Sequence, residues 1–346
     1  MKRSLLALLV ACSPSVQAKP PKKDAPVTVA ETVTAPAPVA PAPAPTLEAV
    51  LASLPPASQS TSIGSPTNGR LEGGVPFPLA GPGFRHNDKR SRDARYGTVE
   101  VVRAIARAAD RVAHEAPGSE LVVNDLGLPQ GGRISHHGSH RAGRDADILF
   151  FLRDDAGNTR PAVGEALEPD GTGYDYKDLA TADDDVRVHF DAARTWRFVR
   201  ALLEDREAEV QRIFVVEHLR AMLLAEAERS HAPRAIVQRF ADVSCQPGYP
   251  HDDHLHVRWY CSFEDLGKGC EDLVPQYPWR TAELAAAKIK PVLAQRTKSD
   301  DPAEVVTQEQ AEVAVKKQSP HPEVLAFLAR RKAWEKQPHP GRPYCK

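Results

Sequence analysis

The segment PHDDHLHVRWYC, residues 250–261, places His251, His254 and His256 beside two aspartates. Polar and apolar residues alternate through HLHVRWY, as they do in a half-buried β-strand, so His254, His256 and Arg258 should share one face. Neutral imidazole is the commonest metal ligand, and two imidazoles on one polar face can reach the same ion. Because an H-x-H pair alone is a weak signal, the prediction of a metal site depends on a second cluster.

The segment SHHGSHRAGRDADILFF, residues 135–151, holds this second group of candidate ligands. Asp147 begins a continuous apolar run of strand length, and a carboxylate in a buried strand is costly unless it is paired or coordinates a metal. Small residues between His140 and Asp147 let the loop fold back, so that both side chains can approach one ion. A salt bridge from Asp147 to Arg144 or Arg258 is the alternative explanation.

His140, Asp147 and His256 together would form a site with three protein ligands. A catalytic zinc ion typically has three protein ligands and an open position for a water molecule, whose pKa it lowers to roughly 7. A base or proton shuttle is then needed nearby, and His254 on the same face as His256 is placed for that role. The two clusters together therefore predict a catalytic Zn²⁺ site.

Helical and strand patterns are mixed along the chain without a fixed repeat. Apolar residues at helical spacing predict a helix over 98–115, with Thr98 as its N-cap, and further helices from about Asp191 and after the strand that follows. The expected strands are 120–125, 146–152, 212–217 and 254–260. The mixture indicates an α+β fold, for which we expect a central antiparallel sheet with flanking helices that carries a single zinc site.

The first 75 residues have the composition of targeting and linker segments. A basic start, Lys2 and Arg3, precedes the short apolar run LLALLVA, which predicts a signal peptide over residues 1–18. LVAC is similar to a lipobox, in which case the signal would end before Cys12 and this cysteine would be lipidated. A chance apolar start to a cytosolic chain is the third interpretation. The Pro/Ala-rich residues 19–75 are expected to be a disordered linker.

Charge and cysteine content narrow the class of protein further. The formal net charge of −1 at pH 7 gives no electrostatic reason to expect a nucleic-acid partner. An exported chain would keep Cys245, Cys261, Cys270 and Cys345, which suits two disulfides in an oxidising compartment. A local disulfide between Cys261 and Cys270 is feasible, and the other two cysteines would then tie the C-terminal tail to the core. Four cysteines nevertheless allow three pairings.

Two stretches together resemble the signature motifs of one family. H-x-S-H-x6-D begins at His137, and H-D-D-H-x-H begins at His251. Both are similar to stretches of the penicillin-insensitive murein endopeptidase family, within the zinc superfamily of lysostaphin, D-Ala-D-Ala peptidases and hedgehog-like proteins. The resemblance covers about residues 95–272, including the strand RIFVV and the Cys261…Cys270 pair. The Pro/Ala-rich tether and the C-terminal tail depart from the family pattern.

The resemblance implies a role for each motif residue. His140, Asp147 and His256 would bind Zn²⁺, and His254 would act as a base or as a donor to the tetrahedral intermediate. His137 matches a family histidine beside the zinc, which would be an additional ligand or a substrate contact.

Other residues of the two motifs are less specified. His251 matches another active-site histidine, although for both His137 and His251 a merely neighbouring position stays open. Asp253 and Asp252 could orient imidazoles, as partners of metal-bound histidines usually do, but Asp252 could equally be a solvated loop charge. His136 is expected to be a bystander. The histidines outside both motifs are expected on the surface: His189, His218, His231 and His321.

The resemblance also implies an activity and a location. The chain would be an exported zinc metallopeptidase with its catalytic domain over 76–272 and a partly disordered extension over 273–346, which includes a surface helix at 322–336. It would hydrolyse the D-alanyl to meso-diaminopimelyl bond in peptidoglycan cross-links. No G-x-S-x-G or S-x-x-K signature is present, so we expect β-lactams not to inhibit it. The protein would act in the periplasm, either free or tethered to the outer membrane through lipidated Cys12, and no oligomeric state follows from the sequence.

Three alternatives remain at this point. A D,D-carboxypeptidase or dipeptidase could use the same metal site with a different pocket. A noncatalytic, hedgehog-like zinc binding module would keep the ligands, but the presence of His254 argues against it. A structural envelope tether would use the Pro/Ala segment and leave the buried Asp147 unexplained.

Overall fold

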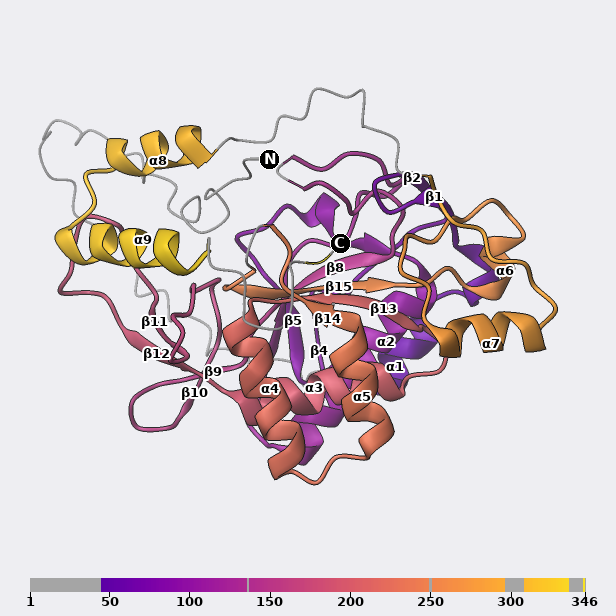
Figure 1. Cartoon of the computed structure of the whole chain (residues 1–346), viewed down its shortest axis with the longest axis horizontal. Coiled ribbons are helices and arrows are strands. Elements are labelled where there is room, and N and C mark those ends of the chain that lie inside the picture. Colours follow the sequence, from indigo (N-terminus) through magenta and orange to yellow (C-terminus); the bar gives the residue numbers. More distant parts are fainter. Residues whose placement is uncertain (1–44, 136, 249–250, 296–307, 336–344, 346) are drawn as a thin grey trace, which may run out of the picture.

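The structure is a computed structural model, which describes residues 45–135, 137–248, 251–295, 308–335 and 345. The expected signal peptide, Cys12, His136 and the Pro/Ala-rich segment up to residue 44 lie outside the described residues. The described part contains helices and sheets together, which confirms the α+β class (Figure 1). No helix among the described residues is long and apolar enough to cross a membrane.

The largest sheet has seven strands in the order β14-β13-β15-β8-β7-β5-β4. Their bounds are Ser244–Cys245, Val210–Phe214, His254–Trp259, Asp145–Leu149, Leu121–Val123, Phe84–His86 and Ala80–Gly81. The contiguous strands β13, β15, β8 and β7 are antiparallel, as expected. The prediction of an antiparallel sheet is wrong for two outer pairs, β13 with β14 and β5 with β7, which are parallel. Parallel neighbours need a long crossover, and helices provide it in both cases.

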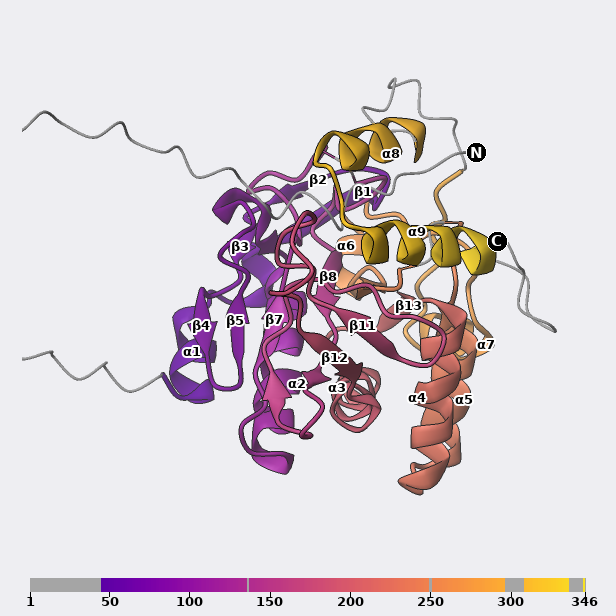
Figure 2. The same cartoon turned by 90° about the vertical axis from the view of Figure 1, so that its left-hand side faces the viewer.

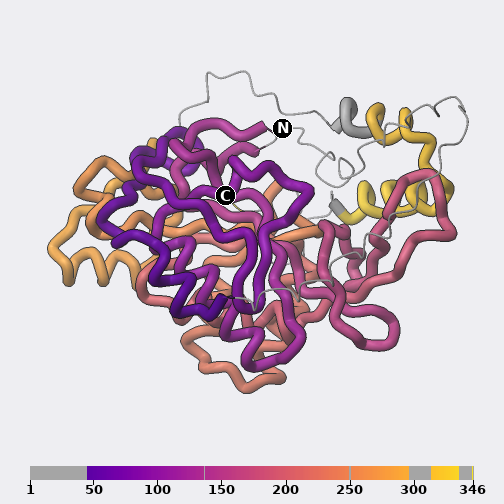
Figure 3. Tube along the Cα trace, turned by 180° about the vertical axis from the view of Figure 1, so that it is seen from behind, coloured from indigo at the N-terminus to yellow at the C-terminus, as the bar shows by residue number. Residues whose placement is uncertain are grey.

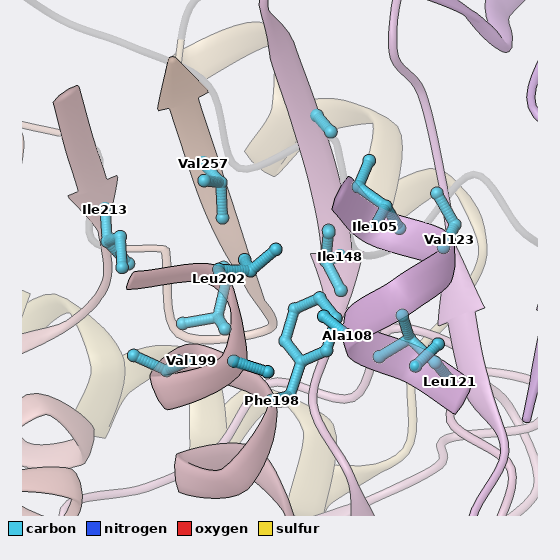
Figure 4. Packing of buried hydrophobic residues seen from close by; sticks show 14 of the residues in the cluster. Ile105, Ala108, Leu121, Val123, Ile148, Phe198, Val199, Leu202, Ile213 and Val257 are labelled. Carbon is cyan, nitrogen blue, oxygen red and sulfur yellow. The ribbon is translucent and has the colours of Figure 1, made fainter. Parts of the chain in front are cut away.

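Helices cover one face of this sheet. The crossover from β5 to β7 contains α2 (Val99–Glu115), and the crossover from β13 to β14 contains α4 (Glu217–Arg229) and α5 (Arg234–Val243). The helix expected over 98–115 is therefore confirmed, with Thr98 at its N-cap position. Side chains of α2 and of α3 (Ala192–Glu204) meet the sheet in the hydrophobic core (Figure 4). Burial of these apolar faces is the main stabilising contribution to the fold.

A smaller lobe follows β8. The apolar run expected as one strand over 146–152 is divided between β8 and β9, and β9 starts a second sheet with the order β10-β9-β12-β11. The bounds of these strands are Thr159–Arg160, Leu152–Arg153, Arg187–Phe190 and Thr172–Tyr174. In Figures 1 and 3 this lobe lies beside the C-terminal helices α8 (Gln308–Lys317) and α9 (Pro322–Glu335).

Residues 45–74 are folded, which corrects the expected linker boundary. They contain α1 (Leu47–Ser53), a short 3-10 helix (Ala57–Gln59) and the hairpin of β1 (Thr61–Ser65) and β2 (Asn68–Glu72). Leu71 is buried. The short segment SPTNG reads as a linker because it is rich in turn-forming residues, and those residues build the turn of this hairpin. The strands β3 (Val75–Pro76) and β6 (Tyr96–Gly97) pair next to it, and a second 3-10 helix spans Arg92–Ala94.

The C-terminal region is attached to the body of the protein. It contains α6 (Phe263–Leu266) and α7 (Pro278–Ala286) before α8 and α9. Disulfides join Cys261 to Cys270 and Cys245 to Cys345, one of the three pairings left open above. A helix was expected on the surface over 322–336. The observed helix α9 is exposed on one side only, because it buries Val324, Phe327 and Arg331. The sequence pattern underestimated this contact because the buried stripe includes a charged residue.

Candidate metal centre

The register of β15 against β8 brings the two histidine clusters together. His256 lies opposite Asp147, Arg258 lies opposite Asp145, and His254 lies opposite Leu149. Side chains of directly paired residues share a face, so both aspartates lie on the histidine face of the sheet. The alternating residues of β15 point into the core, as Val257 does in Figure 4. The sequence alternation therefore indicated the correct faces.

Four imidazoles surround the buried carboxylate of Asp147, which is 3% exposed. Its Oδ1 lies 3.3 Å from His140 Nε2, 3.4 Å from His254 Nε2 and 3.4 Å from His256 Nδ1. Its Oδ2 lies 3.5 Å from His137 Nδ1. The loop before β8 supplies two of these rings and the strand β15 supplies the other two. The Asp147 carboxylate therefore has a ring nitrogen of each of four histidines within 3.5 Å.

The second ring nitrogen of each histidine has its own oxygen partner. The four pairs are His140 Nδ1 to Leu126 O at 2.7 Å, His256 Nε2 to Asp145 Oδ1 at 2.8 Å, His254 Nδ1 to Asp253 Oδ1 at 2.8 Å, and His137 Nε2 to Asp125 Oδ2 at 2.9 Å. In a neutral imidazole, the nitrogen that donates to such an acceptor carries the proton, and the nitrogen that faces Asp147 then carries the lone pair. This second layer of oxygen acceptors is typical of metal-binding histidines.

Two atoms at the meeting point are buried and have no hydrogen-bond partner among the described residues. They are His140 Nε2 and Asp147 Oδ1. Buried polar atoms are nearly always paired, so an unpaired acceptor beside other ring nitrogens indicates room for a cation. His137, His140 and Asp147 each offer a ligand atom within 4.8 Å of the others. His256 is not in that group of three. The imidazole and carboxylate donors suit zinc.

The pKa values of the buried groups in the site are shifted in different directions. Burial would raise the pKa of Asp147, but His140 and His254 lower it well below its ordinary value, so this carboxylate is ionised. Burial lowers the pKa of His256 to about 4, which keeps its ring neutral, as a ligand must be. Burial would also lower the pKa of His254, but Asp253 and Asp147 raise it well above its ordinary value. His256 therefore binds a proton weakly and His254 binds one tightly, although both lie on β15.

Residues at the edge of the site have unusual backbone conformations. His140 has φ of +67° and His251 has φ of +55°, in the left-handed region that non-glycine residues rarely adopt. Such strain persists only where surrounding contacts hold it. The ring centroid of His251 lies 4.9 Å from that of His254, so His251 borders the cluster. Gly143, with φ of +70°, packs its backbone on Leu71, where a Cβ would lie 2.8 Å from the leucine side chain.

The alternative salt bridges proposed for Asp147 are not formed by the expected partners. Arg258 Nε donates to Asp145 at 2.7 Å, and Arg144 is paired with Asp272 at 3.3 Å. Asp145 thereby joins Arg258 to His256. Reasoning from the sequence gave Asp145 no role. Its position two residues before Asp147 in the same strand was the available signal.

Two further expectations need correction. Asp252 is not a solvated loop charge, because it is 0% exposed and both its oxygens accept hydrogen bonds from Arg331 at 2.7 Å. His321 is not a surface residue, because it is buried and its Nε2 lies 2.9 Å from Asp185. Asp125 was missed, although it ends the expected strand 120–125 and lies next to His137.

Comparison with known proteins is consistent with the paired motifs. The family model described as penicillin-insensitive murein endopeptidase matches residues 62–329. Proteins of that name are 29% identical over 222 residues in Haemophilus influenzae (63% of this chain, 68% of the relative), and 31% identical over 217 residues in Pectobacterium atrosepticum (61% and 69%). A relative from Escherichia coli O157:H7 is 28% identical over 223 residues (63% and 72%).

The family match is wider than the resemblance seen in the motifs. It begins within β1 and ends within α9, so the folded N-terminal hairpin and most of the C-terminal region are included. The expectation that the chain departs from the family directly after residue 272 is therefore wrong up to residue 329. The chain belongs to the penicillin-insensitive murein endopeptidase family.

Proposed function

We propose that this protein is a zinc-dependent endopeptidase that hydrolyses peptide cross-links of bacterial peptidoglycan. Family membership supports the substrate class. The observation that carries the proposal is the convergence of four imidazole nitrogens on the buried Asp147, where two acceptor atoms have no hydrogen-bond partner among the residues that the structure describes. The bond would be the amide between D-alanine and meso-diaminopimelate.

The proposed zinc ligands are His140, Asp147 and His256. Leu126 O and Asp145 fix the outer nitrogens of the two rings, so their inner nitrogens are oriented before any ion binds. A zinc ion held there would polarise the scissile carbonyl and make a water molecule acidic enough to attack it.

His254 is the proposed acid–base catalyst. Its Nδ1 is held by Asp253, and its Nε2 faces the site. A bound Zn²⁺ would offset the charge of Asp147, one of the groups that raise the pKa of His254, so that Nε2 would be unprotonated. As a general base, it would take a proton from the attacking water while the new carbon–oxygen bond forms. It would then deliver the proton to the leaving amine nitrogen as the carbon–nitrogen bond breaks. No serine takes part in these steps, so β-lactams, which acylate serine, would not block them.

His137 and His251 have supporting roles in this proposal. His137 belongs to the group of atoms that could hold an ion, so it would serve as an additional ligand or contact the substrate. His251 lies beside His254 at the edge of the cluster and would contact the substrate. The protein would act in the periplasm, either released from residues 1–18 or tethered through lipidated Cys12.

Incubation of the mature chain with purified cross-linked peptidoglycan, with and without a chelator, tests the proposal. The full mature chain is needed because α1 and the β1–β2 hairpin are part of the fold. We expect metal-dependent conversion of cross-linked dimers to monomers, with product masses that identify the bond. Loss of terminal D-alanine alone would instead indicate a carboxypeptidase. No product from a folded, zinc-loaded protein would indicate a binding module.

A further inference from the structure

Asp252 lies close to the site in sequence, but the partner that neutralises its charge, Arg331, lies near the C-terminal end of the chain. Arg331 Nε and one terminal nitrogen each donate to a different oxygen of Asp252 at 2.7 Å. Arg331 is 1% exposed and Asp252 is 0% exposed. A bidentate pair of this kind fixes orientation as well as charge. A fully buried pair also makes each partner dependent on the other, because either one alone would be an uncompensated charge.

Asp252 occupies a strained turn that leads into the proposed catalytic residues. It follows His251, whose φ of +55° is unfavourable, and it precedes Asp253 and His254. The backbone of the turn has two anchors in the body of the protein. Val216 N donates to His251 O at 3.0 Å, and Leu167 N donates to Asp252 O at 2.9 Å. The side chain of Asp252 is the third anchor, and Arg331 holds it.

The helix α9 is seated so that Arg331 points inward. Val324, Phe327 and Arg331 follow helical spacing and form its buried stripe. The Trp334 ring packs edge-on against His218 with centroids 5.0 Å apart. Beyond α9, the Cys245–Cys345 disulfide attaches the chain to β14. Figures 1 and 2 both show α9 beside β11 of the smaller lobe.

We propose that Arg331 is a positioning residue for the cleavage reaction, and this inference depends on the proposed function. Arg331 neutralises Asp252 and holds the turn, so that Asp253 accepts from His254 Nδ1 and His254 Nε2 faces the substrate. Without Arg331, the Asp252 carboxylate would move toward solvent or toward the neighbouring imidazoles and compete with Asp253. Arg331 lies outside the family match, which ends at residue 329, so the family resemblance does not supply this role.

Arg331→Lys and Arg331→Gln in the mature chain test the inference, with Arg330→Gln as matched control. Arg330 is the next residue along α9 and pairs with Glu168 at 2.7 Å, but it is 46% exposed and holds no part of the turn. We measure kcat and KM on a cross-linked muropeptide dimer, per folded and metal-loaded molecule. For Arg331→Gln we expect kcat to fall about 10- to 100-fold with KM nearly unchanged, since small misplacements of a catalytic group have effects of this size.

Lysine keeps the charge but not the bidentate geometry, so Arg331→Lys should fall between the wild type and Arg331→Gln. Arg330→Gln should keep kcat within about twofold, because exposed ion pairs contribute little. If Arg331→Gln does not fold, kcat and KM are measured instead on Arg331→Lys and on the neutral double variant Asp252→Asn/Arg331→Gln. A role in stability alone would lower the melting temperature and leave kcat per folded molecule unchanged.

The outcomes separate this inference from the proposed function. Cleavage by the wild type with unchanged kcat in Arg331→Lys and in the double variant would overturn the positioning role and leave the proposed function intact. Absence of cleavage by the folded, zinc-loaded wild type would overturn both.

Discussion

Asp147 and Asp252 are both buried carboxylates beside the same strand, but they are balanced in opposite ways. Four imidazole nitrogens approach Asp147, and one of its oxygens has no hydrogen-bond partner among the described residues. Both oxygens of Asp252 accept hydrogen bonds from the guanidinium of Arg331. Beside four ring nitrogens, the unpaired oxygen of Asp147 indicates a place for a cation, whereas the fully paired Asp252 supports the structure around the site. The difference predicts which substitution removes the metal ion and which destabilises the fold around it.

Asp147→Asn should have the largest effect on activity. The amide keeps the shape of the side chain but removes the negative charge that a zinc ion needs. We expect zinc to be lost from the purified protein and cleavage to fall by at least about a thousandfold. Metal content by mass spectrometry and dimer cleavage are measured on the same sample. A variant that keeps one zinc ion and wild-type activity would contradict the assignment of Asp147 as a ligand.

His254→Ala should lower cleavage by about 100- to 10,000-fold, because it removes the acid–base group. Unlike Asp147→Asn, it should leave the zinc content unchanged, since His254 is not among the proposed ligands. The same two measurements apply. Loss of zinc in step with activity would instead make His254 a ligand.

Asp145→Asn should have an intermediate effect, about 10- to 100-fold on zinc affinity, because it weakens the acceptor that orients His256. Competition with a chromogenic chelator measures the affinity. Asp265→Asn is a useful control, because Asp265 is a buried carboxylate that accepts from Ser62 N, outside the histidine cluster. Equal losses of zinc affinity in both variants would show that the effect of Asp145→Asn is one of general destabilisation.

Asp252→Asn should show the reverse profile from Asp147→Asn. It leaves Arg331 buried without its counter-charge, so we expect the free energy of unfolding to fall by about 3–5 kcal/mol while zinc remains bound. Chemical denaturation with metal analysis checks this. If stability were unchanged and zinc were lost, Asp252 would belong to the metal site and the comparison would fail.

Glu100 extends the comparison to a third way of balancing a buried carboxylate, by a proton. Burial raises the pKa of Glu100 to about 7 from an ordinary value of 4.5. A raised pKa in the folded state contributes stability that is complete below the unfolded value and is lost as the pH rises through about 7. The loss should be about 3 kcal/mol. Glu100→Gln should remove this part of the pH dependence without affecting cleavage. If Glu100→Gln left the pH dependence of the free energy of unfolding unchanged, the raised pKa of Glu100 would be contradicted.

The sequence predicted the local part of the site well. Strand alternation placed His254, His256 and Arg258 on one face, and the cost of burying Asp147 indicated that it needed partners. These predictions depend on neighbouring residues and on one strand geometry, which a sequence carries directly. The main helices and strands around the site followed from the same periodicities.

Contacts between distant segments were not predictable in this way. Arg331 and Asp252 are 79 residues apart, and no periodic pattern relates them. The β1–β2 hairpin read as linker because its turn residues are also linker residues. The parallel outer strands depend on crossovers through helices, which the sequence showed as helices without indicating where the next strand would pair.

Titration of the metal-free protein with zinc tests whether the histidine cluster around Asp147 is a catalytic zinc centre. Cleavage of the cross-linked dimer is measured at each addition, together with bound metal. We expect no cleavage without metal, a linear rise in cleavage with added zinc, and full activity at one bound zinc ion per chain. The same titration of Asp147→Asn should stay flat. Full activity in the metal-free wild type would contradict the claim that the histidine cluster around Asp147 is a zinc centre.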